Sequence, residues 1–343
     1  MRAAVFKETG KPLVIETVAN PECGPTDLIL KVKNCGICGS DLHMTEATSI
    51  QPLPGGSVMG HEFAGEIMEV GSAVKGKWKV GERVVGFPYI YCGECAGCRN
   101  AGTGFGVCEK GVGVGLGQSH GAYAEFVRIG STGAHRLPSI VNFHEGAMIE
   151  PLSVGLHAVD KSAMQRGATV LVIGGGIMGL LTMALARRRG AKRLILSDPI
   201  EERRRIARSL GAHVVVDPSK ESLRERVMSL TKDRGADVVC EAVGKPELVA
   251  EALALTRATG YLQLVGVNPK GSTLPLDLWD VHYREIRIGG AFGRGTAFRR
   301  ALTLMPKLGV RKLVTARFPL SRIAEAFAHA SAGHGAKTVI TPS

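Results

Sequence analysis

The stretch VLVIGGGIMGLLTMALARRR, residues 170–189, decides the fold of this chain. Its first four residues are apolar and predict a buried strand, three glycines follow, and the apolar and small residues after them predict a helix that ends at three arginines. The glycines interrupt the apolar run, so we interpret it as a strand followed by a helix and not as a membrane span. Such a strand, turn and helix typically begin an α/β domain.

The same alternation of strand and helix continues as far as residue 290. The predicted strands are short and mostly β-branched: Val170–Ile173, Leu194–Ser197, Val214–Val216, Val238–Cys240, Leu262–Val265 and Ile286–Ile288. Amphipathic helical patterns such as Glu201–Leu210 and Glu247–Thr256 lie between the first five, and most of them end at a glycine that suits a helix C-cap. Six strands with helical crossovers predict a doubly wound, parallel six-stranded sheet of the Rossmann type.

The two ends of the chain differ from this middle part. Their predicted elements are strands at Leu28–Val32, Phe63–Val70, Arg83–Gly86 and Lys337–Ile340, and helices at Phe298–Leu308 and Arg322–Ala330. Short strands separated by glycine and proline are typical of a mainly β domain. We therefore expect residues 1–150 and 291–343 to form two pieces of one mainly β catalytic domain, with residues 151–290 inserted between them as a nucleotide-binding domain.

Composition and charge limit the partners. The 343 residues suffice for two domains, and the formal net charge of +12 would attract nucleic acid or an anionic membrane surface. However, the basic runs Arg187–Arg189 and Arg203–Arg205 fall on predicted helices without aromatic residues, so we interpret them as solvated helix faces. We expect no nucleic-acid or membrane partner and, without an apolar signal segment, a cytoplasmic protein.

The glycine turn has the G-x-G-x-x-G pattern between a strand and a helix. It consists of Gly174, Gly175, Gly176, Ile177, Met178 and Gly179. In this setting the first glycine permits the tight turn, the third residue allows a pyrophosphate to approach, and the last permits close packing of helix on sheet. The motif therefore predicts a dinucleotide cofactor bound at the helix N-terminus.

An acidic residue at the end of the second predicted strand bears on which dinucleotide binds. Asp198 would accept hydrogen bonds from the adenosine ribose hydroxyls, and its charge would repel the 2′-phosphate of NADP. We therefore expect NAD. Arg203 could instead pair with a 2′-phosphate, which leaves NADP open, and a helix cap is the structural alternative for Asp198.

Four cysteines lie within one loop. Cys92, Cys95 and Cys98 follow C-x2-C-x2-C spacing, and Cys108 comes ten residues later. Four thiolates can close a tetrahedral structural zinc site. A disulfide framework is not expected in a cytoplasmic chain, and a nucleic-acid zinc ribbon would need basic and aromatic neighbours that this loop lacks. Ordinary buried cysteines are the remaining alternative.

A second set of metal-ligand residues is dispersed. It comprises Cys35, Cys38, His61, Glu62 and Glu150. One thiolate, one imidazole and one carboxylate leave a coordination position open on zinc, which is the arrangement of a catalytic site. The Cys35-x2-Cys38 pair could be redox-active, but it lies outside any βαβ unit of the thioredoxin kind.

These motifs resemble the zinc-dependent alcohol dehydrogenases of the medium-chain dehydrogenase/reductase superfamily. The matching segments, in the family's order, are CGICGSDLH at 35–43, GHEFAGEI at 60–67, the cysteine loop, MIEPLSVGLHA at 148–158 and VLVIGGGIMGL at 170–180. Residues 150–155 are similar to the polyol branch, which includes sorbitol and L-idonate dehydrogenases. The resemblance implies a GroES-like catalytic domain and NAD-linked oxidation of a secondary alcohol or polyol to a ketone. It also implies two zinc ions per subunit and a homodimer or homotetramer.

The resemblance also implies roles for particular residues. Cys38 and His61 would hold the catalytic zinc, with either Glu62 or Glu150 as the third protein ligand. Asp41 matches the position that orients the histidine.

Two further residues, Ser40 and His43, match a hydroxyl-and-imidazole proton relay. The segment Met44–Ile50 lacks the aromatic-and-glycine pattern of many polyol enzymes, and the loop from Cys98 to Cys108 is two residues longer than is usual. Because of the segment Met44–Ile50, a threonine-type amino-alcohol dehydrogenase, or a hydrophobic secondary-alcohol dehydrogenase or carbonyl reductase, stays open, whereas the longer loop bears only on Cys108 as a zinc ligand.

Overall fold

The computed structural model describes residues 1–342 except 48, 50–52, 77 and 102–107. The chain forms two compact units. Unit 1 contains Met1–Ser153, Gly293–Lys307 and Val314–Ser343, and unit 2 contains Val154–Phe292 and Leu308–Leu313. The first boundary falls within helix α4 (Ile149–Lys161). Unit 1 is thus built from both ends of the chain.

Unit 2 is a parallel sheet with helices between its strands. The strands are β10 (Thr169–Ile173), β11 (Arg193–Ser197), β12 (Val214–Val216), β13 (Ala236–Glu241), β14 (Thr256–Leu264) and β15 (Arg287–Gly290). The helices are α5 (Ile177–Arg189), α6 (Glu201–Leu210), α7 (Leu223–Thr231), α8 (Pro246–Leu255) and α9 (Leu278–Arg284). The six strands run in the order β12-β11-β10-β13-β14-β15, and every neighbouring pair is parallel. The predicted Rossmann-type sheet is confirmed.

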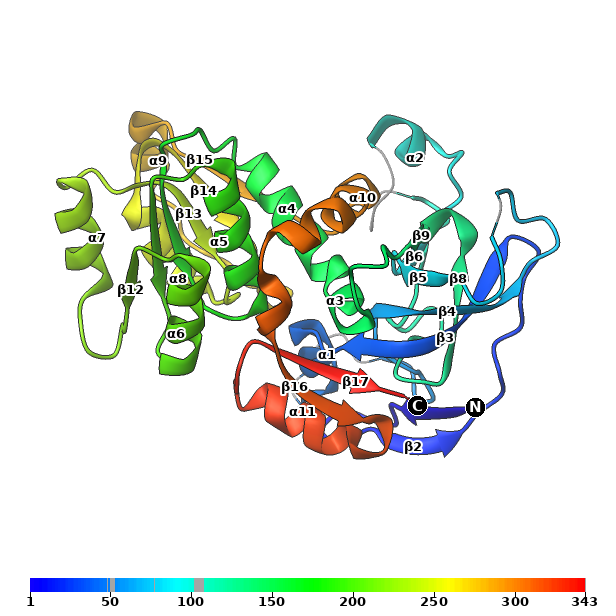
Figure 1. Cartoon of the computed structure of the whole chain (residues 1–343). Coiled ribbons are helices and arrows are strands. Elements are labelled where there is room, and N and C mark those ends of the chain that lie inside the picture. Colours follow the sequence, from blue (N-terminus) through cyan, green and yellow to red (C-terminus); the bar gives the residue numbers. More distant parts are fainter. Residues whose placement is uncertain (48, 50–52, 77, 102–107, 343) are drawn as a thin grey trace. The chain divides into compact units, whose positions relative to one another are not determined.

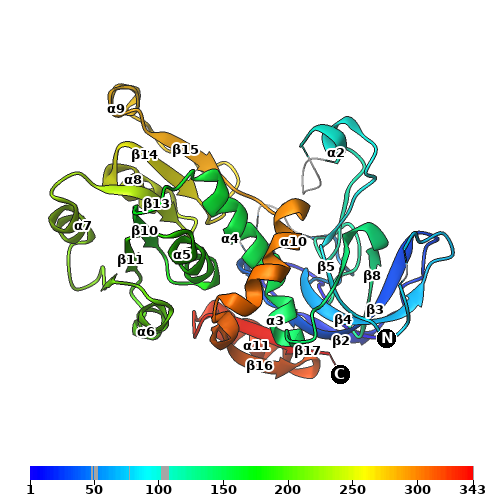
Figure 2. The ribbon, with the colours of Figure 1, turned by 45° about the horizontal axis from the view of Figure 1, so that its top comes forward.

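The apolar runs become strands because helices cover them. Leu171, Ile195 and Val239, on three neighbouring strands, are fully buried in one hydrophobic core. Helices α5 and α6 lie side by side, and α7 contacts α8 (Figure 2). The run from Val170 to Leu185 is β10 followed by α5, as its glycines predicted. No helix among the described residues is long and apolar enough to cross a bilayer.

One interpretation of the basic runs is corrected here. Arg187–Arg189 end α5 and are exposed, as expected for a solvated face. Within the second run, however, Arg204 is only 5 % exposed, whereas Arg205 beside it is exposed. A basic run on a helix places one residue in about four on the inner face, and in α6 that residue is an arginine.

Unit 1 is mainly β. Its strands are β1 (Arg2–Val5), β2 (Val14–Thr17), β3 (Asp27–Gly36), β4 (Glu62–Val70), β5 (Arg83–Gly86), β6 (Tyr89–Ile90), β7 (Val112–Gly113), β8 (Phe126–Gly130), β9 (Ala134–Arg136), β16 (Val314–Pro319) and β17 (Lys337–Thr341). Its helices are α1 (Gly39–Thr45), α2 (Ala96–Ala101), α3 (Phe143–Ala147), α10 (Gly295–Leu304) and α11 (Ile323–Ser331). The short 3-10 turns are η1 (Ser131–Gly133), η2 (Met305–Lys307) and η4 (Leu320–Arg322), with η3 (Val310–Leu313) in unit 2.

The main sheet of unit 1 joins the two ends of the chain. Its order is β16-β17-β3-β4-β5-β9, and β8 also pairs with β3. Strand β17 pairs antiparallel with β3, with Ile340 opposite Cys35, and Figure 1 shows the red C-terminal strand beside the blue one. Both residues are buried in one core together with Phe63 and Tyr123. The C-terminal strand is therefore part of the same core as the first strands.

An aromatic cluster connects α10 to this sheet. The Phe298 ring is fully buried, 5.4 Å from the Phe87 ring and 5.3 Å from the His135 ring, centroid to centroid. Burial, with a smaller contribution from the charge of Arg299, lowers the pKa of His135 to about 4. The imidazole is therefore neutral in the folded chain at neutral pH.

This neutral histidine predicts a loss of stability in mild acid. The pKa of His135 is lower in the folded chain than the value of about 6.5 in the unfolded chain, so the unfolded chain takes up the proton first as the pH falls. The free energy of unfolding should therefore decrease as the pH falls from about 6.5 to about 4, by up to about 3 kcal/mol in total. A His135→Gln variant should lose about 2 kcal/mol less than the natural protein between pH 7 and pH 5 in urea unfolding.

The exposed His282 provides the control, because His282→Gln removes an imidazole that is not buried. If both variants showed the same pH dependence as the natural protein, burial of His135 would not be the cause.

Candidate functional site

The end of β3 and the start of α1 position the first metal-ligand residue. Cys38 is the N-cap of α1, and its backbone N–H donates to Asp41 Oδ2 at 3.0 Å. This capping contact fixes the turn between strand and helix. Ser40 and His43 then lie three residues apart on the same short helix.

Strand β4 brings the next two residues to Cys38. His61 precedes β4, Glu62 begins it, and Glu62 lies opposite Gly36 in the β3–β4 pairing. One ligand atom from each of Cys38, His61 and Glu62 lies within 4.8 Å of the others. Thiolate, imidazole and carboxylate are all zinc ligands, so this donor set fits a zinc ion with an open position.

A buried carboxylate and a tyrosine orient the histidine. Asp41 Oδ1 lies 3.3 Å from His61 Nδ1, and the Tyr123 hydroxyl donates to Asp41 Oδ2 at 2.6 Å. Burial lowers the pKa of His61, but the charge of Asp41 outweighs burial and holds this pKa well above its usual range. Because Nδ1 faces Asp41, Nε2 is the nitrogen left to bind a metal.

Glu62 shares its buried position with a lysine from the C-terminal strand. The Glu62 carboxylate forms an ion pair with Lys337, and the side chains are 0 % and 1 % exposed. The Lys337 ammonium also donates to the Ile37 carbonyl at 2.8 Å. Burial lowers the pKa of Lys337, but the charge of Glu62 outweighs this effect and the net shift is upward. Glu62 Oε1 remains buried without a hydrogen-bond partner, which suits an atom that binds a metal.

The other candidate third ligand lies in the first turn of α4. Glu150 is not among the described residues whose ligand atoms lie within 4.8 Å of Cys38 and His61. Burial, opposed by the charge of His61 and supported by that of Glu62, raises the pKa of Glu150 to about 7. In this structure Glu62, and not Glu150, completes the close group.

The two residues of the predicted relay differ in exposure. Ser40 is half-buried, whereas the His43 side chain is 64 % exposed and its Nδ1 lies 3.2 Å from Glu46 Oε1. Within the described chain no hydrogen bond joins Ser40 to His43. Their helical spacing nevertheless places them on one face, with the imidazole on the solvent side.

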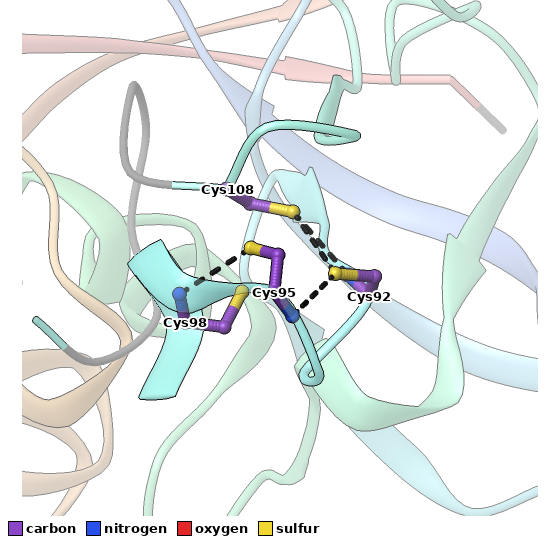
Figure 3. Close-up of side chains that lie close together, drawn as sticks. All are labelled: Cys92, Cys95, Cys98 and Cys108. Atoms are coloured by element: carbon purple, nitrogen blue, oxygen red, sulfur yellow. Dashed lines mark hydrogen bonds between the residues drawn. The ribbon is translucent and has the colours of Figure 1, made fainter. Parts of the chain in front are cut away.

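The four loop cysteines form a compact cluster (Figure 3). The Sγ atoms of all four lie within 4.8 Å of one another, and Cys108 Sγ is 3.5 Å from Cys92 Sγ. The backbone N–H groups of Cys95 and Cys98 donate to the Sγ of Cys92 and Cys95, each at 3.4 Å. Such N–H donors stabilise thiolates, and the bond from the Cys98 N–H is the main cause that lowers the pKa of Cys95 to about 6. The donor set fits a closed tetrahedral zinc site.

The longer loop before Cys108 lies at residues 102–107, outside the described part of the chain, as do Thr48 and Ile50 of the segment that follows His43. Cys108 itself is described and buried, and its carbonyl accepts a hydrogen bond from the Tyr89 hydroxyl at 3.5 Å. The longer loop therefore still returns the fourth cysteine to the other three.

In unit 2 the glycine turn follows β10 as predicted. Gly174 has φ +97°, and a Cβ on it would lie 2.6 Å from a Val243 methyl. A Cβ on Gly176 would meet nothing within 4 Å, so the chain leaves open space there in front of α5. Gly176 is the N-cap of α5, whose first residues are Ile177, Met178 and Gly179. Open space at a helix N-terminus suits a pyrophosphate.

Asp198 follows β11 and faces this turn. Its side chain is 3 % exposed, and its Oδ2 accepts from the Gly175 N–H at 2.7 Å while Oδ1 accepts from the Ile200 N–H at 2.8 Å. Ile200, not Asp198, is the N-cap of α6. Arg203 Nη1 lies 3.7 Å from Asp198 Oδ2. The two residues that predict opposite cofactor preferences are thus neighbours.

Comparisons with known proteins agree with this geometry. Residues 24–139 match the model of the alcohol dehydrogenase GroES-like domain, and residues 178–307 match that of zinc-binding dehydrogenases. Sorbitol dehydrogenase of Bacillus subtilis strain 168 is 31 % identical over 338 residues, covering 96 % of this chain and 93 % of the relative. L-threonine 3-dehydrogenase of Idiomarina loihiensis is also 31 % identical, covering 98 % of each.

A solved structure is similar over nearly the whole length. It is a zinc-binding dehydrogenase of Sinorhizobium meliloti 1021 bound to NADP, 33 % identical, with a TM-score of 0.91 over 99 % of both chains. The chain therefore belongs to the zinc-dependent alcohol dehydrogenases of the medium-chain dehydrogenase/reductase superfamily. It is a zinc- and nicotinamide-dependent oxidoreductase that acts on small-molecule alcohols, and it lies near the polyol branch of that family.

Sequence reasoning missed two residues of the site. Tyr123 and Lys337 touch Asp41 and Glu62, but both lie far from them in the sequence. A signal was present for Lys337, since it begins the apolar strand Lys337–Ile340, where an unpaired cation would be costly. The sequence alone did not indicate its partner.

The buried ion pair predicts a large effect of a single substitution. Lys337→Met would leave the Glu62 carboxylate buried without its cation, and should lower the free energy of unfolding by about 3–5 kcal/mol. Adding Glu62→Gln should recover most of this loss, because no uncompensated charge then remains. Guanidinium unfolding of the single and double variants measures both changes.

Lys33 provides a matched control, because it pairs across β3 and β4 with a second glutamate of β4. It pairs with Glu66 at 3.0 Å, but these side chains are 28 % and 33 % exposed. Lys33→Met should cost less than about 1 kcal/mol. Equal losses for Lys33→Met and Lys337→Met would contradict a buried ion pair at Glu62.

Proposed function

We propose that this dehydrogenase oxidises a secondary alcohol or polyol to a ketone with NAD, and reduces the ketone in reverse, at a zinc ion held by Cys38, His61 and Glu62. The close approach of these three unlike donors carries the proposal. Cys38, His61 and Glu62 would hold a zinc ion that would supply a Lewis acid for the alcohol oxygen, and a bound nicotinamide would supply the hydride acceptor.

The residues around the donors supply orientation and proton transfer. Asp41 and Tyr123 hold His61 with Nε2 directed to the metal position. Ser40 would accept the proton of the alcohol hydroxyl and pass it toward His43, which lies on the same face of α1. The exposed imidazole of His43 then exchanges this proton with water.

Glu150 has a different proposed role. It lies outside the close group of Cys38, His61 and Glu62, and burial raises its pKa to about 7, which disfavours the ionised form that binds a metal. We assign it to the surroundings of the catalytic group, with Glu62 as the third protein ligand.

The cofactor proposal rests on the glycine turn and Asp198. The pyrophosphate would bind at Gly174, Gly176 and Gly179, against Ile177 and Met178 of the first helical turn. The buried Asp198 carboxylate favours the ribose hydroxyls of NAD over a 2′-phosphate. Arg203 opposes this preference, and the similar Sinorhizobium enzyme is bound to NADP, so we propose NAD with residual use of NADP.

The substrate class follows from the relatives. The Bacillus relative is a sorbitol dehydrogenase, which supports a polyol or secondary alcohol. The Idiomarina relative, equally identical, is an L-threonine 3-dehydrogenase and supports the amino alcohol as the second candidate. Both groups of substrates carry a secondary hydroxyl that becomes a ketone, so the same zinc chemistry serves either.

We also propose a second, structural zinc ion at Cys92, Cys95, Cys98 and Cys108. Four thiolates leave no open position, so this ion would order the loop and take no part in the reaction.

A homodimer or homotetramer in the cytoplasm is our proposal for the assembled state. Strand β15 is the last of the six-stranded sheet, and large apolar side chains around it are exposed, among them Leu278, Trp279 and Tyr283 at 74 %, 64 % and 66 %. An open sheet edge beside an apolar patch is typical of an interface with a second copy.

The activity is tested with a panel of polyols, secondary alcohols and threonine, each with NAD and with NADP, by following the absorbance of the reduced cofactor. We expect oxidation of at least one secondary alcohol with NAD, and loss of activity after zinc chelation. Ser40→Ala should lower kcat about a hundredfold or more while zinc content stays unchanged. If no alcohol reacted with either cofactor, or chelation had no effect, the proposal would be wrong.

Removing one loop cysteine tests the structural ion. Cys108→Ser should lower the metal content from about two zinc ions per chain to about one, and should also lower Tm. Cys23→Ser, which lies outside both clusters, should change neither. Metal analysis by mass spectrometry decides; a natural protein with a single zinc ion, unaltered in Cys108→Ser, would contradict the second site.

A further inference from the structure

Arg204, the middle residue of the basic run Arg203–Arg205 in α6, has a buried side chain. Its side chain is 6 % exposed, whereas that of Arg208, one turn later, is 51 % exposed. Burying a guanidinium is costly unless its N–H groups find acceptors. The acceptors of the Arg204 N–H groups therefore indicate which parts of the structure this side chain stabilises.

Three acceptors surround the Arg204 guanidinium. Nη1 donates to the Asp198 backbone carbonyl at 2.6 Å. Nη2 lies 2.9 Å from Asp217 Oδ2, just beyond the end of β12, and both Nε and Nη2 donate to Glu201 in the first turn of α6. Arg204 thus joins the ends of two neighbouring parallel strands to the helix that follows the first of them.

Asp198 is consequently held from two sides. Its carboxylate accepts the N–H groups of Gly175 and Ile200, and its carbonyl accepts the Arg204 guanidinium. The bonds to the glycine turn set where the carboxylate lies, and the Arg204 bond fixes the main chain that carries it. Since the fork of a guanidinium is rigid, the contact restricts both position and direction.

We propose that Arg204 is a positioning residue for cofactor selectivity, because it fixes the main chain of Asp198 and so keeps that carboxylate where it accepts the ribose hydroxyls and repels a 2′-phosphate. The inference rests on the proposed NAD role of Asp198. Arg204 itself contacts no cofactor, since its N–H groups are directed to Asp198, Glu201 and Asp217. Its neighbour Arg203, 3.7 Å from the Asp198 carboxylate, is the arginine placed to meet an anion.

Loss of Arg204 affects the two cofactors in opposite ways. If the main chain at Asp198 relaxes, the carboxylate makes poorer hydrogen bonds to the ribose of NADH. The same displacement weakens its repulsion of the 2′-phosphate of NADPH. A residue that only stabilised the fold would instead weaken both cofactors equally.

The test measures the Kd of NADH and of NADPH by fluorescence at one fixed salt concentration. Arg204→Met should shift the ratio of the two Kd values toward NADPH by about tenfold, the effect of losing one well-placed hydrogen bond to a charged group. Asp217→Asn, which removes the charge that holds Arg204, should shift the ratio in the same direction by a smaller factor. This second variant keeps the test available if Arg204→Met does not fold.

Arg208→Met is the matched control. It removes the same charge from the same helix, and its exposed pair with Glu201 at 2.9 Å leaves the Arg204 contacts in place. Its ratio should equal that of the natural protein, which separates positioning from a general loss of positive charge.

The outcomes distinguish this inference from the proposed function. If the natural protein bound NADH and the ratio did not change in Arg204→Met and Asp217→Asn, or changed equally in Arg208→Met, only the role of Arg204 would be wrong. If the natural protein bound neither reduced cofactor, the proposed function would fail and this inference with it.

Discussion

A buried carboxylate that needs a cation constrains the whole of unit 1. Glu62 begins β4 without access to water, and the ammonium that compensates it comes from Lys337 on β17. Because β17 pairs with β3 and β3 pairs with β4, the sheet itself delivers the cation to the anion. The proposed zinc ligands depend on the same sheet, because Cys38 follows β3 and His61 precedes β4, and these two strands are paired.

Compensation of buried charge recurs in unit 2. Asp198, which faces the glycine turn, and Asp217, just beyond β12, are both buried, and Arg204 contacts both. At each site a buried basic side chain contacts an acidic residue for which we propose a function. In this proposal the basic residue restricts where the acidic residue lies. These contacts explain why Lys337 and Arg204 are buried in a protein with a large positive net charge.

Local sequence patterns correctly predicted the elements that are formed by residues close together in the sequence. The strand, glycine turn and helix at 170–189, the helix Glu201–Leu210 and the spacing of the loop cysteines all involve residues close in sequence, and the structure agrees with them. Tyr123, Lys337 and the burial of Arg204 were not predictable in this way, because each depends on which distant segments meet. The sequence around Lys337 or Arg204 does not indicate which residue each side chain pairs with, because that depends on the tertiary structure.

The position of β17 has a consequence for synthesis on the ribosome. Unit 2 has nearly all its residues once Phe292 has emerged, so its sheet can form while the chain is still growing. Unit 1 must wait, since its sheet lacks β16 and β17 until the last residues appear. During that interval Cys35 and Gly36 of β3 lack the strand that pairs with them, and Glu62 has no cation. The group of Cys38, His61 and Glu62 is thus completed only after unit 2 can fold.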